Sequence, residues 1–326
     1  MTVVVSKEVN EALASGAPIV ALETAVLTAG LPRTLWNDSF GPRPMTISGD
    51  QPINIALADA MNSAVVSNGA VPAWIAVVDG VLRIGLSHEE RAALSNDQDA
   101  GKVSLATFAQ TMQDGRSAGT TVAATLLACK LASEKNPIRV FATGGIGGIH
   151  QNWAQRFDIS ADLTALATTP TCVVASGAKS ILDIPATVEA LETIGVPVIG
   201  IGTSQFPRFI EKNAKEDPTI YQGESAEKVA SICRHHWEHL ALNSAVLTSA
   251  PVPDDVALEQ GTLIDALTKA EAKWAALHQP SATRTPYLLD AMAKITQGAS
   301  LVANLALLCN NAKVAANISV ALATNV

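Results

Sequence analysis

The 326-residue chain is short of positive charge, with 22 Lys and Arg against 30 Asp and Glu and a formal net charge of −8. A protein that binds nucleic acid mainly through the phosphate backbone needs a net basic face, so we expect no nucleic-acid partner. Charged residues make up only 16% of the chain and apolar residues 48%. This composition is typical of compact globular proteins rather than disordered ones.

Cysteine and long apolar runs are also scarce. The four cysteines, at 129, 172, 233 and 309, form no CxxC pair, which excludes a zinc ribbon and a dithiol redox motif. We expect them to be buried, reduced thiols. No run approaches the roughly 20 uninterrupted apolar residues of a membrane span, and the first ten residues lack a basic stretch followed by an apolar core. The sequence therefore predicts a cytoplasmic protein with no membrane partner.

Short apolar, β-branched runs alternate with helical stretches along most of the chain. The strand-like runs cover residues 71–79, 138–143, 171–175 and 196–201, and helical patterns cover 120–132, 188–194 and 300–323. Such strands, separated by helices, indicate a parallel sheet that is covered on both faces. We therefore predict an α/β protein with layered α/β/α architecture and a mostly parallel central sheet.

One segment breaks this regularity. Residues 33–52 contain three prolines and two glycines, which predicts an irregular loop of unusual length. We find no repeat and no convincing domain linker elsewhere. The sequence predicts one domain over residues 1–326, with this loop as an insertion.

The first candidate site motif is glycine-rich. Residues 143–150 read TGGIGGIH directly after a strand-like run, where ligands gather in open α/β sheets. Backbone N–H groups in such a loop can face an anion such as phosphate, and a tight structural turn fits the spacing equally well. His150 is a candidate ligand contact, although a lone histidine is more often a structural polar residue.

Two carboxylates follow. Asp158 and Asp162 are four residues apart, so on one helical turn they share a face. Two neighbouring carboxylates suit a hard divalent cation that is held partly by water. In the alternative, Asp158 or Ser160 caps the helix that follows.

A lysine and a glutamate stand in apolar surroundings. Lys179 follows an apolar strand and a Ser-Gly-Ala turn; a lysine held at low dielectric loses its ammonium form easily, which is the environment of a Schiff-base lysine. Alternatively it reaches the surface at a helix N-terminus, where the helix dipole disfavours a cation. Glu23 lies within the apolar run 19–26, where burial raises the pKa of a carboxyl towards that of a general acid. Alternatively, Glu23 faces solvent on an edge strand.

One cluster resembles a metal site. His235, His236 and His239 lie close together in the sequence, but no third ligand of suitable spacing and no HExxH motif accompanies them. We expect a solvated helix face here rather than a metal site.

An ordered set of motifs resembles one family. It includes ALETAVLT at 21–28, GTTVAAT at 119–125, FATGGIGG at 141–148, DISAD at 158–162 and GAKSILD at 177–183. These stretches occur in family order along almost the whole chain, and the chain thereby resembles the pseudouridine-5′-phosphate glycosidases, the indigoidine synthase A-like family. Its 33–52 loop is longer than the family norm.

The resemblance implies a function and a set of residue roles. The reaction is the reversible cleavage of the C–C glycosidic bond of pseudouridine 5′-phosphate to uracil and ribose 5-phosphate, with a divalent metal, typically Mn²⁺. Lys179 would be the covalent nucleophile, Glu23 the proton donor and Asp158 the metal ligand. Substrate contacts would come from Lys102, Val122, Ser160, Ala161, Asp162, His150 and Asn304. Relatives form trimers, so a homo-oligomer is expected.

The chemistry gives these roles a reason. The leaving group is a carbon atom, so the usual route through a protonated leaving heteroatom does not apply. An amine provides another route, because it converts the sugar into an iminium and divides one difficult step into several. Lys102 would either lower the pKa of Lys179 or bind the phosphate. The alternatives are a Schiff-base lyase or aldolase acting on another sugar phosphate, and a non-catalytic sugar-phosphate-binding relative.

Overall fold

The computed structural model describes residues 3–263 and 284–324, and between them 268, 270, 272–274 and 276. Within these residues eleven strands form one sheet. They are β1 (Val3–Val5), β2 (Ile19–Glu23), β3 (Val71–Val78), β4 (Val81–Ile84), β5 (Gly101–Val103), β6 (Ala118–Thr120), β7 (Val140–Ala142), β8 (Cys172–Ala175), β9 (Val198–Ile201), β10 (Tyr221–Gly223) and β11 (Val246–Ser249).

The sheet is mostly parallel, as predicted. Its strand order is β1-β4-β3-β2-β7-β8-β11-β9-β10, and β6 pairs with β3 and β5. Only the β3–β4 and β3–β6 pairs are antiparallel among the described strands. Strands β2, β7 and β8 are neighbours in the middle of the sheet, so their carboxyl ends meet at one edge.

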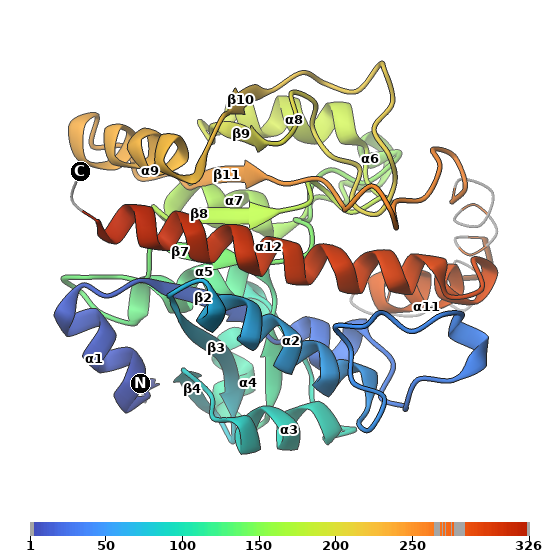
Figure 1. Cartoon of the computed structure of the whole chain (residues 1–326), viewed down its shortest axis with the longest axis horizontal. Helices are drawn as coiled ribbons and strands as arrows, with labels where there is room; N and C mark the ends of the chain where they lie inside the picture. Colours follow the sequence, from blue (N-terminus) through green and yellow to red (C-terminus); the bar gives the residue numbers. More distant parts are fainter. Residues whose placement is uncertain are drawn as a thin grey trace.

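Helices cover both faces. The described helices are α1 (Lys7–Ser15), α2 (Ile53–Ser67), α3 (His88–Asn96), α4 (Phe108–Gln113), α5 (Val122–Leu131), α6 (Trp153–Arg156), α7 (Ala161–Thr168), α8 (Ile184–Thr193), α9 (Ala226–Arg234), α11 (Arg284–Ile295) and α12 (Ala299–Ala323). Helix α12 crosses one face of the sheet, packing on β2, β7 and β8 between α2 and α9 (Figure 1). Helices α5 and α7 pack against each other on the opposite face, which confirms the α/β/α layering.

Helix α12 is long enough and apolar enough to span a membrane. Half of its most apolar stretch is buried inside the protein, and the helix packs on the central strands. The helix is rich in apolar residues because it packs on the central strands and between α2 and α9. Helix α12 is therefore a core helix of the fold.

The predicted elements are found with shifted ends. The helix expected over 188–194 begins earlier, at Ile184, because the Asp183 side chain accepts the N–H of Ala186 and caps it. It stops as predicted before Gly195, whose φ of +69° lies in the left-handed region. The helix expected from residue 120 begins at Val122, since Thr120 belongs to β6.

The 33–52 loop is irregular, as predicted, apart from one 3₁₀ turn, η2 (Asp38–Phe40). It ends where Pro52 precedes α2. The loop packs against the connection between α11 and α12, so closely that a Cβ at Gly298 would collide with the backbone of Phe40. The loop therefore lies beside the N-terminal end of α12.

The cysteines and histidines follow the predictions in part. All four cysteines are free; Cys129, Cys172 and Cys233 are buried and Cys309 is half-buried. The histidines lie on a π-helical turn, η4 (His235–His239), and no group of three or more potential metal ligands exists among the described residues. The expected solvated face is wrong for His236, which is buried and lies 2.8 Å from the Ser244 hydroxyl.

Candidate functional site

A cavity of about 390 Å³ opens at the carboxyl edge of the central strands. Glu23 is the last residue of β2, and the segments after β7 and β8 also reach the cavity wall. All ten site residues expected from the sequence line it: Glu23, Lys102, Val122, His150, Asp158, Ser160, Ala161, Asp162, Lys179 and Asn304. The fold therefore brings these ten residues together from seven separate parts of the chain.

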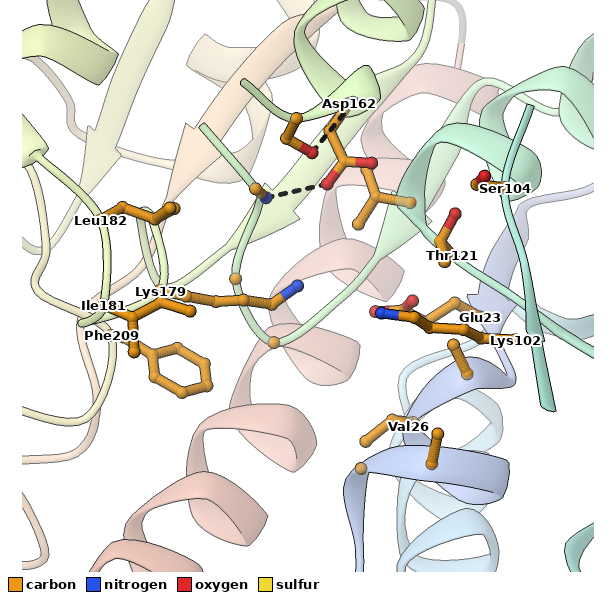
Figure 2. Close-up of a pocket in the computed structure, with 18 of the residues that line it drawn as sticks. Glu23, Val26, Lys102, Ser104, Thr121, Asp162, Lys179, Ile181, Leu182 and Phe209 are labelled. Atoms are coloured by element: carbon orange, nitrogen blue, oxygen red, sulfur yellow. Dashed lines mark hydrogen bonds between the residues drawn. The ribbon is translucent and has the colours of Figure 1, made fainter. Parts of the chain in front are cut away.

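Lys179 extends into this cavity from the loop between β8 and α8 (Figure 2). The alternative, a surface lysine at a helix N-terminus, is wrong, because Lys179 lines the cavity and α8 begins only at Ile184. Its backbone N–H donates to the Ile146 carbonyl at 3.2 Å. The preceding turn needs Gly177, whose φ is +69° and where a Cβ would collide with the Pro207 carbonyl. These constraints hold the lysine backbone against the glycine-rich loop.

Glu23 faces Lys179 across the cavity, and Lys102 enters beside it (Figure 2). Because β2 lies between β3 and β7, the edge-strand alternative is wrong. Burial raises the pKa of the Glu23 carboxyl, and the attraction of Lys179 and a hydrogen bond from the Thr143 hydroxyl partly offset this. The sequence-based prediction of a raised pKa is confirmed. Such a carboxyl is suited to donate a proton.

Lys102, on β5, is half-buried. Burial lowers the pKa of its ammonium group, and repulsion by Lys179 lowers it further, against the attraction of Asp162 and Glu23. Two lysines and several carboxylates thus share one small cavity. Titratable groups whose pKa values are shifted in one cavity mark it as a candidate site for acid–base chemistry.

Asp162, on the first turn of α7, is 6% exposed and joins two other segments. Its Oδ1 accepts the N–H of Ala123 at 3.0 Å, and its Oδ2 accepts the N–H of Gly147 at 2.8 Å. Figure 2 shows the carboxylate above the two lysines. A Cβ at Gly147 would collide with Ser160 and Asp162, so this close approach requires glycine.

Asp158 does not share a helical face with Asp162, contrary to the expectation. It lies outside the helix, two residues before the Ser160 cap of α7, and the Ser160 hydroxyl accepts the Asp162 N–H at 3.2 Å. The capping alternative, with Ser160 as the cap, is therefore confirmed. Asp158 lies instead beside His150, with 3.9 Å between Oδ1 and Nε2.

The donor set at this position fits a metal only in a limited way. Both Asp162 oxygens already accept backbone N–H groups, and the Asp158 carboxylate lies 3.9 Å from His150. Divalent cations of the Mg²⁺ and Mn²⁺ type do bind through a single carboxylate, with water and substrate oxygens as the other ligands. The site is compatible with that mode and not with an all-protein cage.

The glycine-rich loop uses most of its amides within the protein. The N–H groups of Ile146, Gly147, Ile149 and His150 donate to Gly177, Asp162, Thr187 and Asp158, respectively. None of the loop glycines has a positive φ. These four amides are therefore engaged in a structural turn, which is the alternative that the spacing left open.

An anion site is better formed by the N-terminus of α5. Thr121 and Val122 line the cavity there, next to Ser104 and Lys102. The Thr121 hydroxyl is buried and has no hydrogen-bond partner among the described residues. Helix N-termini carry partial positive charge and N–H groups without partners inside the helix; Asp162 accepts one of these, from Ala123, and the rest of this wall can bind a phosphate.

Sequence reasoning missed several wall residues. In the sequence Thr143 only begins the glycine-rich loop, whereas in the structure its hydroxyl donates to Glu23. Thr121 and Ser104 each come directly after a short strand. A polar residue at the end of a strand is a candidate site residue, so this position could have identified them. Phe209 gave no signal, because it reaches the cavity through a long loop after β9.

Comparisons with known proteins agree on the family. A sequence profile described as indigoidine synthase A like protein matches residues 44–321. Pseudouridine-5′-phosphate glycosidases from Dinoroseobacter shibae and Myxococcus xanthus are 40% and 41% identical over 98% of this chain and 96% and 97% of their own lengths.

Two solved structures are also similar. They are the prealnumycin C-glycosynthase AlnA in complex with ribulose 5-phosphate, and an indigoidine synthase A-like protein from Thermotoga maritima. Each matches with a TM-score of 0.82 and 30% identity over 99% of this chain and 97% of its own. Sequence and structure together show that the chain belongs to the indigoidine synthase A-like family.

Proposed function

We propose that this protein is an enzyme that cleaves the C–C glycosidic bond of pseudouridine 5′-phosphate, reversibly, to uracil and ribose 5-phosphate. One observation carries the proposal: the Lys179 amine and the Glu23 carboxyl, whose pKa is raised by burial, lie opposite each other in one cavity. The names of the relatives, which span nearly the whole chain, support the same substrate.

The charges of the cavity orient the substrate. The phosphate binds at the N-terminus of α5, where Lys102, Ser104 and Thr121 gather. The ribose then spans the cavity, with C1′ at the Lys179 amine and the ring oxygen towards Glu23. In this arrangement Lys102 serves as the phosphate ligand, because a phosphate beside its ammonium group offsets the repulsion that Lys102 experiences from Lys179. Val122, Ser160, Ala161, Asp162, His150 and Asn304 complete the substrate contacts.

The reaction proceeds through a lysine adduct. The neutral Lys179 nitrogen bonds to C1′ while the C1′–O4′ bond breaks, and Glu23 gives its proton to O4′, which opens the ribose. The new ammonium on Lys179 returns a proton to the Glu23 carboxylate, which passes it to C5 of uracil. The nitrogen lone pair then forms the iminium as the C1′–C5 bond breaks and uracil leaves. The remaining iminium between Lys179 and C1′ is hydrolysed by water to ribose 5-phosphate and the free amine.

A divalent cation, Mn²⁺, is the proposed cofactor, with the Asp158 carboxylate as its protein ligand. When bound, it supplies positive charge that neutralises substrate oxygens near the polar wall of the cavity. The homotrimer and the cytoplasmic location that the resemblance and the composition indicate stay predictions.

The direct test measures uracil release from pseudouridine 5′-phosphate, with and without Mn²⁺, for the wild type and for Lys179→Ala. We expect release by the wild type and loss of detectable turnover in the variant. Lys130→Ala, which removes an exposed lysine on α5, is the matched control and should retain activity. Wild-type protein that releases no uracil would contradict the proposed substrate.

A trapping experiment tests the covalent step. Borohydride reduction in the presence of ribose 5-phosphate should add one reduced pentose phosphate to Lys179, located by peptide mass spectrometry. An adduct at Lys179 in a protein that releases no uracil from pseudouridine 5′-phosphate would favour a Schiff-base lyase or aldolase that acts on another sugar phosphate. An unmodified Lys179 in an active enzyme would exclude the lysine as nucleophile.

A further inference from the structure

A second cavity, of about 820 Å³, adjoins the one that holds Lys179. Four residues line both: Ala29, Gly30, Phe209 and Asn304. We call the second cavity the outer chamber. Its walls come from the 33–52 loop, from α11 and from the start of α12, and most of its lining residues are apolar, including Leu31, Pro32, Phe40, Ile210 and Leu301. The inserted loop therefore forms part of a cavity that continues from the proposed active site.

Phe209 is the one large apolar side chain in the shared wall. It is 4% exposed, and its backbone is in the left-handed region, with φ +61°. Its N–H donates to the Ser176 carbonyl at 3.0 Å. The ring lies so close to the glycine-rich loop that a Cβ at Gly145 would be 2.9 Å from its Cδ2 atom. An unfavourable backbone conformation held by these contacts fixes the ring in place.

The aglycone reaches this wall if the proposed function is correct. With C1′ at Lys179 and the phosphate at the opposite wall, the base attached to C1′ extends to the side from which Lys179 enters. Phe209, Ile181 and Leu182 form that side (Figure 2). An apolar, partly aromatic surface suits the face of a planar base.

We propose that Phe209 sets the size of the aglycone: its ring packs against a single-ring base and separates the reaction cavity from the outer chamber, which accepts a second ring once the side chain is removed. This inference rests on the proposed function and adds a specificity-determining residue to it. The volume and the apolar lining of the outer chamber are sufficient for an additional aromatic ring.

The experiment compares kcat/KM for two substrates, pseudouridine 5′-phosphate and its N1-benzyl derivative. The wild type should strongly prefer the parent. Phe209→Gly should shift the ratio towards the benzyl compound by about tenfold or more, the scale on which an apolar pocket excludes extra bulk. Glycine is chosen because it accepts the positive φ at this position without strain. Phe209→Leu, which keeps part of the apolar contact, should give a smaller shift in the same direction.

Phe40→Ala is the control, because Phe40 lines the outer chamber only. With the Phe209 ring in place, this variant should leave the substrate ratio unchanged. An unchanged ratio in folded Phe209 variants, an equal loss on both substrates, or a wild type that accepts both equally would overturn the inference while the proposed function stands. A wild type inactive on pseudouridine 5′-phosphate would overturn both.

Discussion

The Asp162 carboxylate connects three segments, so Asp162→Asn should cost stability as well as activity. Its two oxygens accept the backbone N–H groups of Ala123, at the start of α5, and of Gly147, in the glycine-rich loop. Asparagine has one acceptor oxygen and one donor NH₂ group. The variant can therefore satisfy only one of the two N–H groups and places a donor against the other.

The magnitude follows from these contacts. A hydrogen bond to a charged group contributes about 1.5–3 kcal/mol, and a negative charge at a helix N-terminus adds about 0.3–1 kcal/mol. Because two such bonds are lost and asparagine retains one neutral hydrogen bond worth about 1 kcal/mol, we expect a net loss of about 2–6 kcal/mol. An unfolding entropy of about 2.1 cal/mol/K per residue over 326 residues converts this to a melting-temperature decrease of about 3–9 °C.

The assay combines thermal and urea denaturation with uracil-release kinetics. Asp217→Asn is the matched control: Asp217 is also buried and accepts an N–H from Ala214 and a bond from Arg208, but it does not line the cavity. Both variants should be destabilised, and only Asp162→Asn should lose kcat. An Asp162→Asn protein that melts at the wild-type temperature would refute the reasoning, since it would show that these two bonds do not hold the segments together.

Two further predictions concern the proton donor and the metal. The Thr143 hydroxyl lowers the pKa of Glu23, so Thr143→Val should raise that pKa further. Because the acid must be protonated to act, the alkaline limb of the pH profile of kcat/KM should move to higher pH in Thr143→Val. Thr143→Ser keeps the hydroxyl and should leave the limb in place. A limb that moves to lower pH in Thr143→Val would contradict Glu23 as the proton donor. Asp158→Asn should weaken Mn²⁺ binding, measured by calorimetry or electron paramagnetic resonance, whereas Asp114→Asn at the surface should not. Equal Mn²⁺ affinity in wild type and Asp158→Asn would remove Asp158 as the ligand.

Much of the fold could be predicted because it depends on local patterns. The apolar runs at 71–79 and 171–175 are strands since they are buried on both faces, and Gly195 ends a helix because it accepts a positive φ. Helix starts were harder. A spacing of four places Asp158 and Asp162 on one face only if both are helical, and the Ser160 cap excludes Asp158. Likewise the Asp183 cap leaves Lys179 in a loop.

By itself, then, the sequence determined the alternation of strands and helices, the family resemblance and ten of the residues that line the cavity. Only the tertiary structure decided how they meet: Thr143 with Glu23, Asp162 with Ala123 and Gly147, and Phe209 between the two cavities. The physical reason is that periodicity and capping act over a few residues. Contacts between residues tens of positions apart depend instead on strand order and on the course of long loops, which no local pattern specifies.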